Sequence, residues 1–263
     1  MEKQKIFTFW EPETSMPDYI KLCIETWNKY LLEYEIIKLN YSNLDEYIGK
    51  NYFDKILYKK FSLAKQADAI RCAVLKKYGG IWLDADTIIT SPGVKSLFDI
   101  QSDFVLIDNH IGFIKANKNS YILEKWEKKL HKRLFEFRYY RYIAKIINRK
   151  YYKKQKDWDY LGNGIISKYL LIQDKDIFYK IDKNEIKATP EYNYYKDSDL
   201  SSYDCYRKFY FENNFIEYVI NNNSGIIMLH NSWTPEYYKN LSKQEFLEKN
   251  NTLSEIFKYA IYK

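Results

Sequence analysis

Two acidic residues, Asp84 and Asp86, stand one residue apart behind the apolar run "IWL" in the segment "YGGIWLDADTII". Two carboxylates this close repel each other, which costs stability unless a cation lies between them. A hard divalent ion such as Mn²⁺ or Mg²⁺ prefers oxygen ligands and commonly bridges to the phosphates of a substrate. The pair therefore indicates a metal and diphosphate site, although Asp is also common in a simple turn after a strand.

A second pair of charged residues, Asp68 and Arg71, lies in the stretch "FSLAKQADAIRCAVLKKYGG", which predicts a helix that ends at Gly79 and Gly80. Residues three apart share a face of a helix. Because the D-x-D strand follows at once, the carboxylate and the guanidinium can reach the same pocket as Asp84 and Asp86. The alternative is an ordinary ion pair on the helix surface.

The elements that must position these residues alternate between strand and helix. Lys5 to Trp10 and Glu33 to Leu39 predict strands on either side of a helix, and "DFVLID" and "IGFIKA" predict two more. This β-α-β opening predicts an α/β fold with a parallel sheet covered by helices. In such sheets ligands bind at the carboxyl ends of the strands, where the D-x-D falls. The tail "SKQEFLEKNNTLSEIFKYAIY" predicts one final helix, with Ser242 and Glu245 as a capping box.

The composition changes between Lys128 and Lys156, where basic residues interleave with Phe, Tyr and Ile. We expect a helical insertion at about 128–158 within a single domain of residues 1–263. Cations beside apolar side chains suit a helix on an anionic membrane surface, and a solvated insertion is the alternative. The basic residues that carry this expectation include Arg133, Arg138, Arg141, Lys145 and Arg149.

The bulk composition narrows the class of protein. The chain has 263 residues, 46% of them hydrophobic, and a formal net charge of +7, which favours anionic partners or reflects the base composition of the genome. No long apolar leader and no apolar run of roughly 18 residues is visible, so we expect a cytoplasmic protein, peripheral at the inner face of the membrane. Three cysteines, far apart, predict neither a disulfide framework nor a CxxC metal site: Cys23, Cys72 and Cys205.

Several stretches together resemble one enzyme family. "LAKQADAIRCAVLKKYGGIWLDADTII" resembles the core of the D-x-D sugar transferases of glycosyltransferase family 32 and the capsular polysaccharide synthesis proteins. It is similar, more distantly, to the catalytic domain of the large clostridial glucosylating toxins. "KIFTFWEPETSMPDYIKLCIETW", "IGFIKANKNSYIL" and "HNSW" extend the resemblance over nearly the whole chain. The chain departs from the family pattern at Ala67, often Ser, and at "LGNGIIS", where the family usually has Gly-Pro.

The resemblance implies a GT-A type fold, a Rossmann-like sheet that binds a nucleotide sugar and is flanked by helices. It implies a metal-dependent, retaining transfer of a hexose, with UDP-galactose or UDP-glucose as the favoured donor. The implied cofactor is Mn²⁺ or Mg²⁺. The implied acceptor is a glycan, lipid-linked in bacterial surface polysaccharide synthesis, and no nucleic acid is expected as a partner.

At the metal and diphosphate, the resemblance implies that Asp86 binds the metal directly and that Asp84 contacts the ribose and the metal shell. His230 would lie near the metal and the diphosphate, and Trp233 would close over the diphosphate. From the residues alone, a lone His is as often structural as functional. Trp233 could equally be a core aromatic residue.

For the rest of the donor, the resemblance implies that Asp68 and Arg71 hold the sugar hydroxyls, Arg71 as a catalytic residue. Phe9 and Trp10 would line the pocket of the nucleotide base, unless Trp10 is part of the core. Asn163, between two glycines, is a candidate contact to the donor sugar or the acceptor.

Two other classes of protein stay open at this point. A nucleic-acid-binding protein would use the basic aromatic segment, but it would leave the D-x-D and the Asp68–Arg71 pair without a role. A phosphatase of the haloacid dehalogenase type uses D-x-D-x-T in its first strand. Here the fifth position is Ile88, and the motif follows a βαβα stretch.

Overall fold

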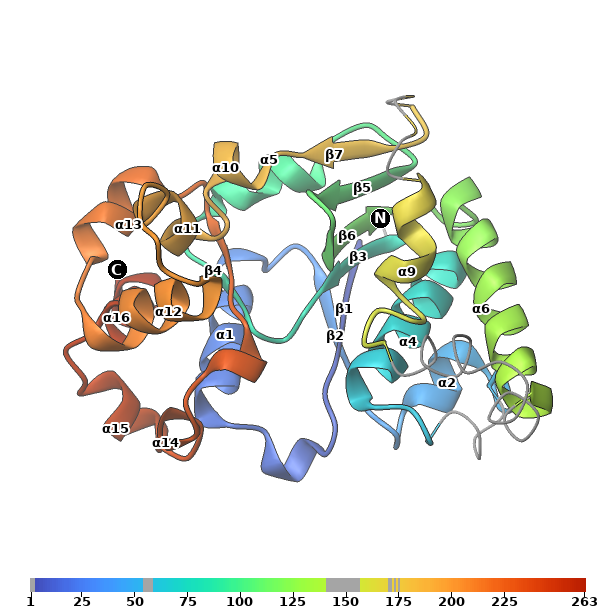
Figure 1. Cartoon of the computed structure of the whole chain (residues 1–263), viewed down its shortest axis with the longest axis horizontal. Helices are drawn as coiled ribbons and strands as arrows, with labels where there is room; N and C mark the ends of the chain where they lie inside the picture. The colour runs from blue at the N-terminus through green and yellow to red at the C-terminus, as the bar shows by residue number, and fades with distance from the viewer. Residues whose placement is uncertain (1–2, 54–58, 141–156, 170–171, 173, 175) are drawn as a thin grey trace.

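A six-stranded sheet runs through the middle of the molecule in the order β2-β1-β3-β6-β5-β7 (Figure 1). The computed structural model describes residues 3–53, 59–140, 157–169, 172, 174 and 176–263. The strands of this sheet are β1 (Lys5–Phe9), β2 (Glu35–Leu39), β3 (Gly80–Leu83), β5 (Phe104–Ile107), β6 (His110–Ala116) and β7 (Tyr179–Ile181).

The sheet is mixed. β1 pairs in parallel with β2 and β3, and β7 pairs in parallel with β5, whereas β6 is antiparallel to both β3 and β5. The parallel opening follows from the β-α-β pattern, and the antiparallel step arises because β5 and β6 are joined by a turn of only two residues. The predicted α/β fold class is confirmed.

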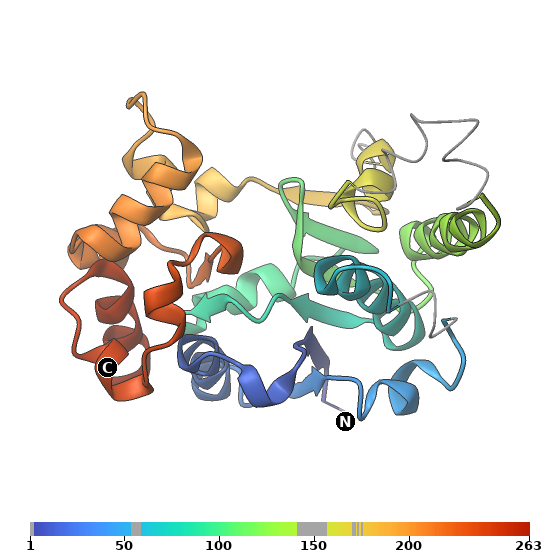
Figure 2. The same cartoon turned by 60° about the horizontal axis from the view of Figure 1, so that its bottom comes forward.

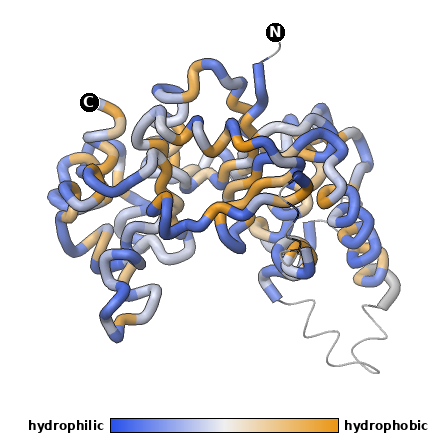
Figure 3. The backbone as a smooth tube through the Cα atoms, turned by 90° about the horizontal axis from the view of Figure 1, so that it is seen from above, coloured by the Kyte–Doolittle hydropathy of each residue, from blue (hydrophilic) through white to orange (hydrophobic). Residues whose placement is uncertain are grey.

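Helices cover both faces of the sheet, and each face has its own apolar cluster. Phe7, Trp82 and Ile114 face α4 (Leu63–Tyr78) and α6 (Tyr121–Tyr140), because alternate residues of a strand point to opposite faces. Two short helices, α2 (Leu44–Ile48) and α9 (Asn163–Ile166), lie on the same side. Figure 3 shows apolar residues concentrated along the central strands.

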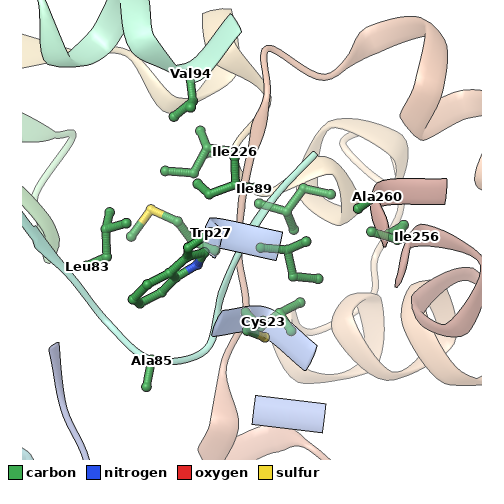
Figure 4. Packing of buried hydrophobic residues seen from close by; sticks show 14 of the residues in the cluster. Cys23, Trp27, Leu83, Ala85, Ile89, Val94, Ile226, Ile256 and Ala260 are labelled. Atoms are coloured by element: carbon green, nitrogen blue, oxygen red, sulfur yellow. The ribbon is translucent and has the colours of Figure 1, made fainter. Parts of the chain in front are cut away.

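The other face carries α1 (Asp18–Tyr30) and a second sheet, in which β4 (Thr87–Ile89) pairs antiparallel with β8 (Ile226–Met228). Figure 4 shows Trp27 of α1 beside Ala85, the middle residue of the D-x-D. Its indole N–H donates to the carbonyl oxygen of Thr87 at 2.7 Å, which ties the start of β4 to the core. Small helices complete this half, which lies opposite α6 in Figure 2: α5 (Lys95–Phe98), α10 (Lys183–Ile186), α11 (Pro190–Tyr194), α12 (Ser202–Arg207), α13 (Ile216–Asn222) and α14 (Glu236–Lys239).

The predicted final helix is two helices, α15 (Lys243–Leu247) and α16 (Thr252–Tyr262). The capping box of Ser242 and Glu245 is confirmed at the start of α15. The prediction of one helix is wrong because the side chain of Asn251 caps a new helix, accepting the N–H of Ser254 at 3.0 Å.

Gly79 and Gly80 end α4 as predicted, and both have positive φ, 69° and 97°. A Cβ on Gly80 would lie 2.5 Å from the carbonyl oxygen of Lys5, so only glycine lets β3 run this close to β1. The two glycines therefore let β3 follow directly after α4, and the D-x-D comes at the carboxyl end of β3.

The expected insertion at about 128–158 is described only in part. α6 extends the predicted helix to Tyr140, and residues 141–156 lie outside the described residues. Contrary to the expectation, Arg133 is not a surface cation. It is 8% exposed, and its side chain donates to the carbonyl oxygens of Tyr160 and Gly164. In the part of the chain that the structure describes, no helix has the length and apolar content needed to cross a bilayer.

Candidate active site

The D-x-D forms the link between the two sheets. The backbone N–H of Asp84 donates to the carbonyl oxygen of Gly112 at 2.8 Å, which holds this residue at the end of β3. A carboxylate oxygen of Asp86 accepts the backbone N–H of Asn231 at 2.8 Å, directly after β8. The pairing of β4 with β8 thus brings His230 and Trp233, almost 150 residues later in the chain, to the D-x-D.

Arg71 joins the two acidic motifs through a buried ionic cluster. Its Nη2 lies 3.1 Å from Asp84 Oδ1 and 3.4 Å from Asp68 Oδ1, and its Nη1 donates to the carbonyl oxygen of Ile111. The guanidinium also lies 4.9 Å from the ring centroid of Trp82. Asp68 and Arg71 are each 5% exposed, so the alternative of a helix-surface ion pair is wrong.

Asp68 lies at the junction of α4 and α9. Burial raises the pKa of Asp68 to about 7, although the positive charge of Arg71 acts in the opposite direction. A Cβ on Gly162 would collide with Asp68 Oδ2, so the start of α9 packs directly on this carboxyl. Asn163, the next residue, is half-buried at the same junction, and its contact to a sugar stays a prediction.

His110 is a site residue that sequence reasoning missed. A Cβ on Gly112 would lie 2.8 Å from both Asp84 Oδ2 and His110 Nδ1, so the carboxylate and the imidazole converge over this glycine. The ring of His110 lies 6.0 Å, between centroids, from the ring of His230. The chain has only three histidines, and two of them meet here, which is the signal that could have found the residue.

His230 is held as a neutral imidazole between aromatic rings. Its ring centroid lies 4.4 Å from that of Trp233 and 5.6 Å from that of Tyr206. Burial, the charge of His110 and the charge of Lys183 lower the pKa of His230 to about 4. A neutral imidazole can coordinate a metal or form hydrogen bonds with a diphosphate, and both roles stay predictions.

The carboxyl end of β1 carries the two residues predicted at the nucleotide base. Phe9 is 7% exposed and its ring lies 5.9 Å from that of Tyr41, so it is largely part of the core. Trp10 is half-buried, and its buried indole N–H has no hydrogen-bond partner among the described residues. An unsatisfied donor at this edge fits a ligand that supplies an acceptor, as a nucleotide base does.

A buried polar wall supports His230 from behind. The phenol oxygen of Tyr206 accepts the backbone N–H of His230 at 3.2 Å, and the ring of Tyr206 packs on that of Tyr210. The Tyr210 hydroxyl donates to Glu191 Oε2 at 2.9 Å, while Glu191 Oε1 lacks a partner among the described residues. Glu191 is fully buried, and burial raises its pKa to about 8.

The titration of Glu191 predicts how stability depends on pH. The folded protein keeps the proton that the unfolded chain loses near the ordinary value of 4.5, so stability falls as pH rises from about 4.5 to about 8. We expect Glu191→Gln to equal the wild type near pH 4.5 and to be more stable by a few kcal/mol at pH 8, since one pKa unit corresponds to about 1.4 kcal/mol. Thermal unfolding across this pH range measures the effect. Parallel pH profiles for the two proteins would contradict the buried, protonated carboxyl.

The D-x-D carboxylates fit a divalent cation. Burial and the charge of Asp84 raise the pKa of Asp86 to about 7, and a cation held between the two carboxylates would offset both effects. No group of three or more His, Cys, Asp or Glu side chains in the described residues forms a ready-made metal site. Mg²⁺ usually binds one or two carboxylates plus substrate phosphates, so Asp84 and Asp86 suit a cation that a bound diphosphate completes. The predicted ligation by His230 is untested.

Comparison with known proteins assigns this chain to a sequence family and to a fold. The sequence model described as "Capsular polysaccharide synthesis protein" matches residues 1–262. No curated protein sequence matches significantly. The apo form of the glycosyltransferase GlyE from Streptococcus pneumoniae TIGR4 has a TM-score of 0.52 and 11% identity, covering 99% of this chain and 61% of GlyE.

Two further solved structures are more distant in shape. The PaToxG glycosyltransferase has a TM-score of 0.42 and 18% identity, covering 64% of this chain and 68% of that one. An active-site mutant of LgtC has a TM-score of 0.43 and 12% identity, covering 89% of this chain and 92% of that one. The likeness to GlyE shows a glycosyltransferase fold and confirms the predicted GT-A type of sheet.

Proposed function

Because the chain belongs to the capsular polysaccharide synthesis protein family, we propose that it is a metal-dependent, retaining glycosyltransferase of surface polysaccharide synthesis. It moves a hexose from a nucleotide sugar, UDP-galactose or UDP-glucose, to a lipid-linked glycan acceptor. The observation that carries this proposal is the ionic cluster at the end of β3, in which the buried Asp68 and Arg71 meet the partly exposed Asp84 of the D-x-D.

The cluster suits a donor sugar beside a diphosphate. Asp68 and Arg71 offer an acceptor and fixed donors for sugar hydroxyls, and Arg71 ties them to the D-x-D at 3.1 Å. A divalent cation held by Asp84 and Asp86 would supply Lewis-acid stabilisation of the leaving diphosphate. His230 would form a hydrogen bond with the diphosphate as a neutral imidazole, held in place by Trp233 and Tyr206.

The stereochemical outcome is the part of the proposal that rests on the family resemblance. The sugar passes through an oxocarbenium-like state, and the acceptor hydroxyl attacks on the same face as the leaving diphosphate. Front-face displacement needs no carboxylate nucleophile, and it is assigned by analogy with the family.

A thermal-shift panel tests the proposal. Saturating UDP with Mn²⁺ should raise the melting temperature by about 5 °C or more, because 100-fold excess over Kd contributes about 2.7 kcal/mol and each kcal/mol shifts a chain of this size by about 2–4 °C. Mn²⁺ or UDP alone should do less, and Mn²⁺ should then support UDP release from UDP-hexoses. Metal-independent stabilisation by oligonucleotides, or phosphate release from small monoesters, would favour the two rival classes instead.

Gly162→Ala should impair binding of the donor sugar and leave binding of the nucleotide unchanged. The added methyl group meets Asp68 Oδ2 and must displace this carboxyl from the cluster. A misplacement of about 1 Å can cost as much as 100-fold in rate, so we expect UDP-hexose turnover to fall by at least about tenfold. The affinity for UDP, measured by calorimetry, should stay within about threefold, close to a free energy of 0.6 kcal/mol.

Gly93→Ala is the matched control, because a Cβ there would lie 3.2 Å from its nearest neighbour, Ser91 Oγ, and Gly93 is far along the chain from α9. Equal losses of turnover in the two variants would show a general loss of folding and would contradict the proposed role of the α9 junction.

Membrane binding by residues 128–156 stays a prediction, but the buried Arg133 is no longer one of the cations that would contact the membrane. We expect the protein to sediment with anionic liposomes at low salt and to be released near half-molar salt, since each Lys or Arg near such a surface contributes about 1 kcal/mol. Replacing Arg138, Arg141, Lys145 and Arg149 with Gln should abolish sedimentation. If the wild type does not sediment with anionic liposomes at low salt, the prediction is contradicted.

A further inference from the structure

A second pocket, of about 250 Å³, opens beside His110 and His230, the two histidines that lie close to the D-x-D. It lies between the β5–β6 turn, the helices α10 and α11, and the end of β8. The titratable and hydroxyl-bearing side chains that line it are Asp108, His110, Lys183, Thr189, Tyr192 and His230.

The two carboxylate oxygens of Asp84 face different neighbours. Asp84 Oδ1 lies 3.1 Å from Arg71 and accepts the indole N–H of Trp82 at 2.8 Å, so it belongs to the cluster assigned to the donor. Asp84 Oδ2 and the imidazole of His110 converge over Gly112. Because His110 lines the second pocket, its imidazole separates this pocket from Asp84 and the donor site.

We propose that the second pocket, the acceptor pocket, binds one uncharged hexose ring of the acceptor glycan and holds its attacking hydroxyl beside Asp84. The inference rests on the proposed function, because a transferase must bring an acceptor hydroxyl to the carbon that leaves the diphosphate. A pocket that borders the donor site at His110, beside Asp84, and at His230 meets this requirement.

The size and the side chains of the acceptor pocket suit a single sugar. Pockets that bind drug-sized ligands measure about 300–1,000 Å³, so a pocket of 250 Å³ suits a smaller ligand such as one sugar ring. Thr189 is 7% exposed, and its buried hydroxyl has no partner among the described residues. Sugar hydroxyls donate and accept hydrogen bonds, so they can satisfy Thr189, while the Tyr192 hydroxyl lies 3.4 Å from His230 Nε2.

The charges of the acceptor pocket favour an uncharged ligand. Lys183 Nζ lies 3.8 Å from Asp108 Oδ2 and 5.2 Å from the ring centroid of Tyr192. The ammonium is therefore compensated by a carboxylate, whereas a site for phosphate or a sugar acid would present cations that no carboxylate offsets. The vicinal hydroxyls of a neutral hexose can bind an ammonium and a carboxylate at the same time.

The test compares sugar transfer with donor hydrolysis in one reaction. UDP-glucose or UDP-galactose with Mn²⁺ is offered a panel of neutral methyl hexosides, and mass spectrometry measures the methyl disaccharide while released UDP is assayed in parallel. We expect Thr189→Val and Asp108→Asn to lower the ratio of transfer to hydrolysis at least tenfold. Thr8→Val is the matched control, because Thr8 is also buried with an unpartnered hydroxyl among the described residues but does not line this pocket.

Three results would overturn the acceptor pocket. These are a lack of transfer to any neutral methyl hexoside, a preference for methyl glucuronosides or hexose phosphates, and a loss of UDP affinity in Thr189→Val as large as its loss of transfer. If the wild type releases UDP from neither donor, the proposed function fails by itself. Saturation-transfer NMR of the methyl hexosides with the protein alone then decides: signals lost in Thr189→Val and kept in Thr8→Val support the pocket, and no signal with the wild type overturns it.

Discussion

Asp86→Asn should lower both sugar transfer and the slow hydrolysis of the donor by at least about a hundredfold, which corresponds to roughly 2.7 kcal/mol in barrier height. The substitution keeps the size of the side chain and removes its charge. The amide carbonyl can still accept the N–H of Asn231, so the link between the D-x-D and β8 should survive. What is lost is the second carboxylate for a divalent cation, and with it stabilisation of the leaving diphosphate.

The measurement is kcat/KM for UDP-hexose over a range of Mn²⁺ concentrations, together with calorimetry of Mn²⁺ binding in the presence of UDP. Excess Mn²⁺ should restore part of the activity if the lesion is weaker metal binding. Asp99→Asn removes a carboxylate from an exposed position after α5 and serves as the control. Activity near that of the wild type in Asp86→Asn would rule out this residue as the main metal ligand.

Most of the fold that supports this site could be predicted from local patterns. The strand that leads into Asp84, the helix α4 and the glycines where the two meet are short-range features, with apolar spacing and backbone conformations that sequence alone indicates. The approach of His230 to the D-x-D follows, at the level of sequence, from the family resemblance only. The structural cause, pairing of the three-residue strands β4 and β8, is a long-range contact without a local signal.

The features that sequence reasoning missed depend on packing between distant segments. His110 reaches Asp84 only because Gly112 leaves room for both side chains, and no periodicity reports such a convergence. Arg133 is basic in sequence but buried, because its guanidinium caps carbonyl oxygens of a segment about 30 residues later. The burial of Asp68 has a similar origin, since Gly162 at the start of α9 packs on its carboxyl.

Arg71→Lys should lower UDP-hexose turnover by at least about a hundredfold while the affinity for free UDP changes by less than about threefold. The guanidinium of Arg71 reaches Asp68, Asp84 and the carbonyl oxygen of Ile111 at once, and it stacks on Trp82. A lysine keeps the charge, but its single ammonium lacks the planar fork and cannot hold the two carboxylates at these separate positions. The sugar-binding carboxyl of Asp68 and the D-x-D would then lose their fixed relation.

The split between turnover and UDP binding is what distinguishes sugar recognition from nucleotide recognition at Arg71. UDP carries the base, the ribose and the diphosphate but no hexose, so a residue that holds only the hexose leaves its affinity unchanged. Calorimetry with UDP gives the affinity, and initial rates with UDP-glucose and UDP-galactose give the turnover. Arg207→Lys is the matched control, because Arg207, the last residue of α12, also pairs with a carboxylate, that of Glu212, at 3.1 Å. Parallel losses of UDP affinity and turnover in Arg71→Lys, at an unchanged melting temperature, would assign Arg71 to the nucleotide instead. An unchanged turnover would show that transfer does not need the guanidinium of Arg71, since both carboxylates would then work without it between them.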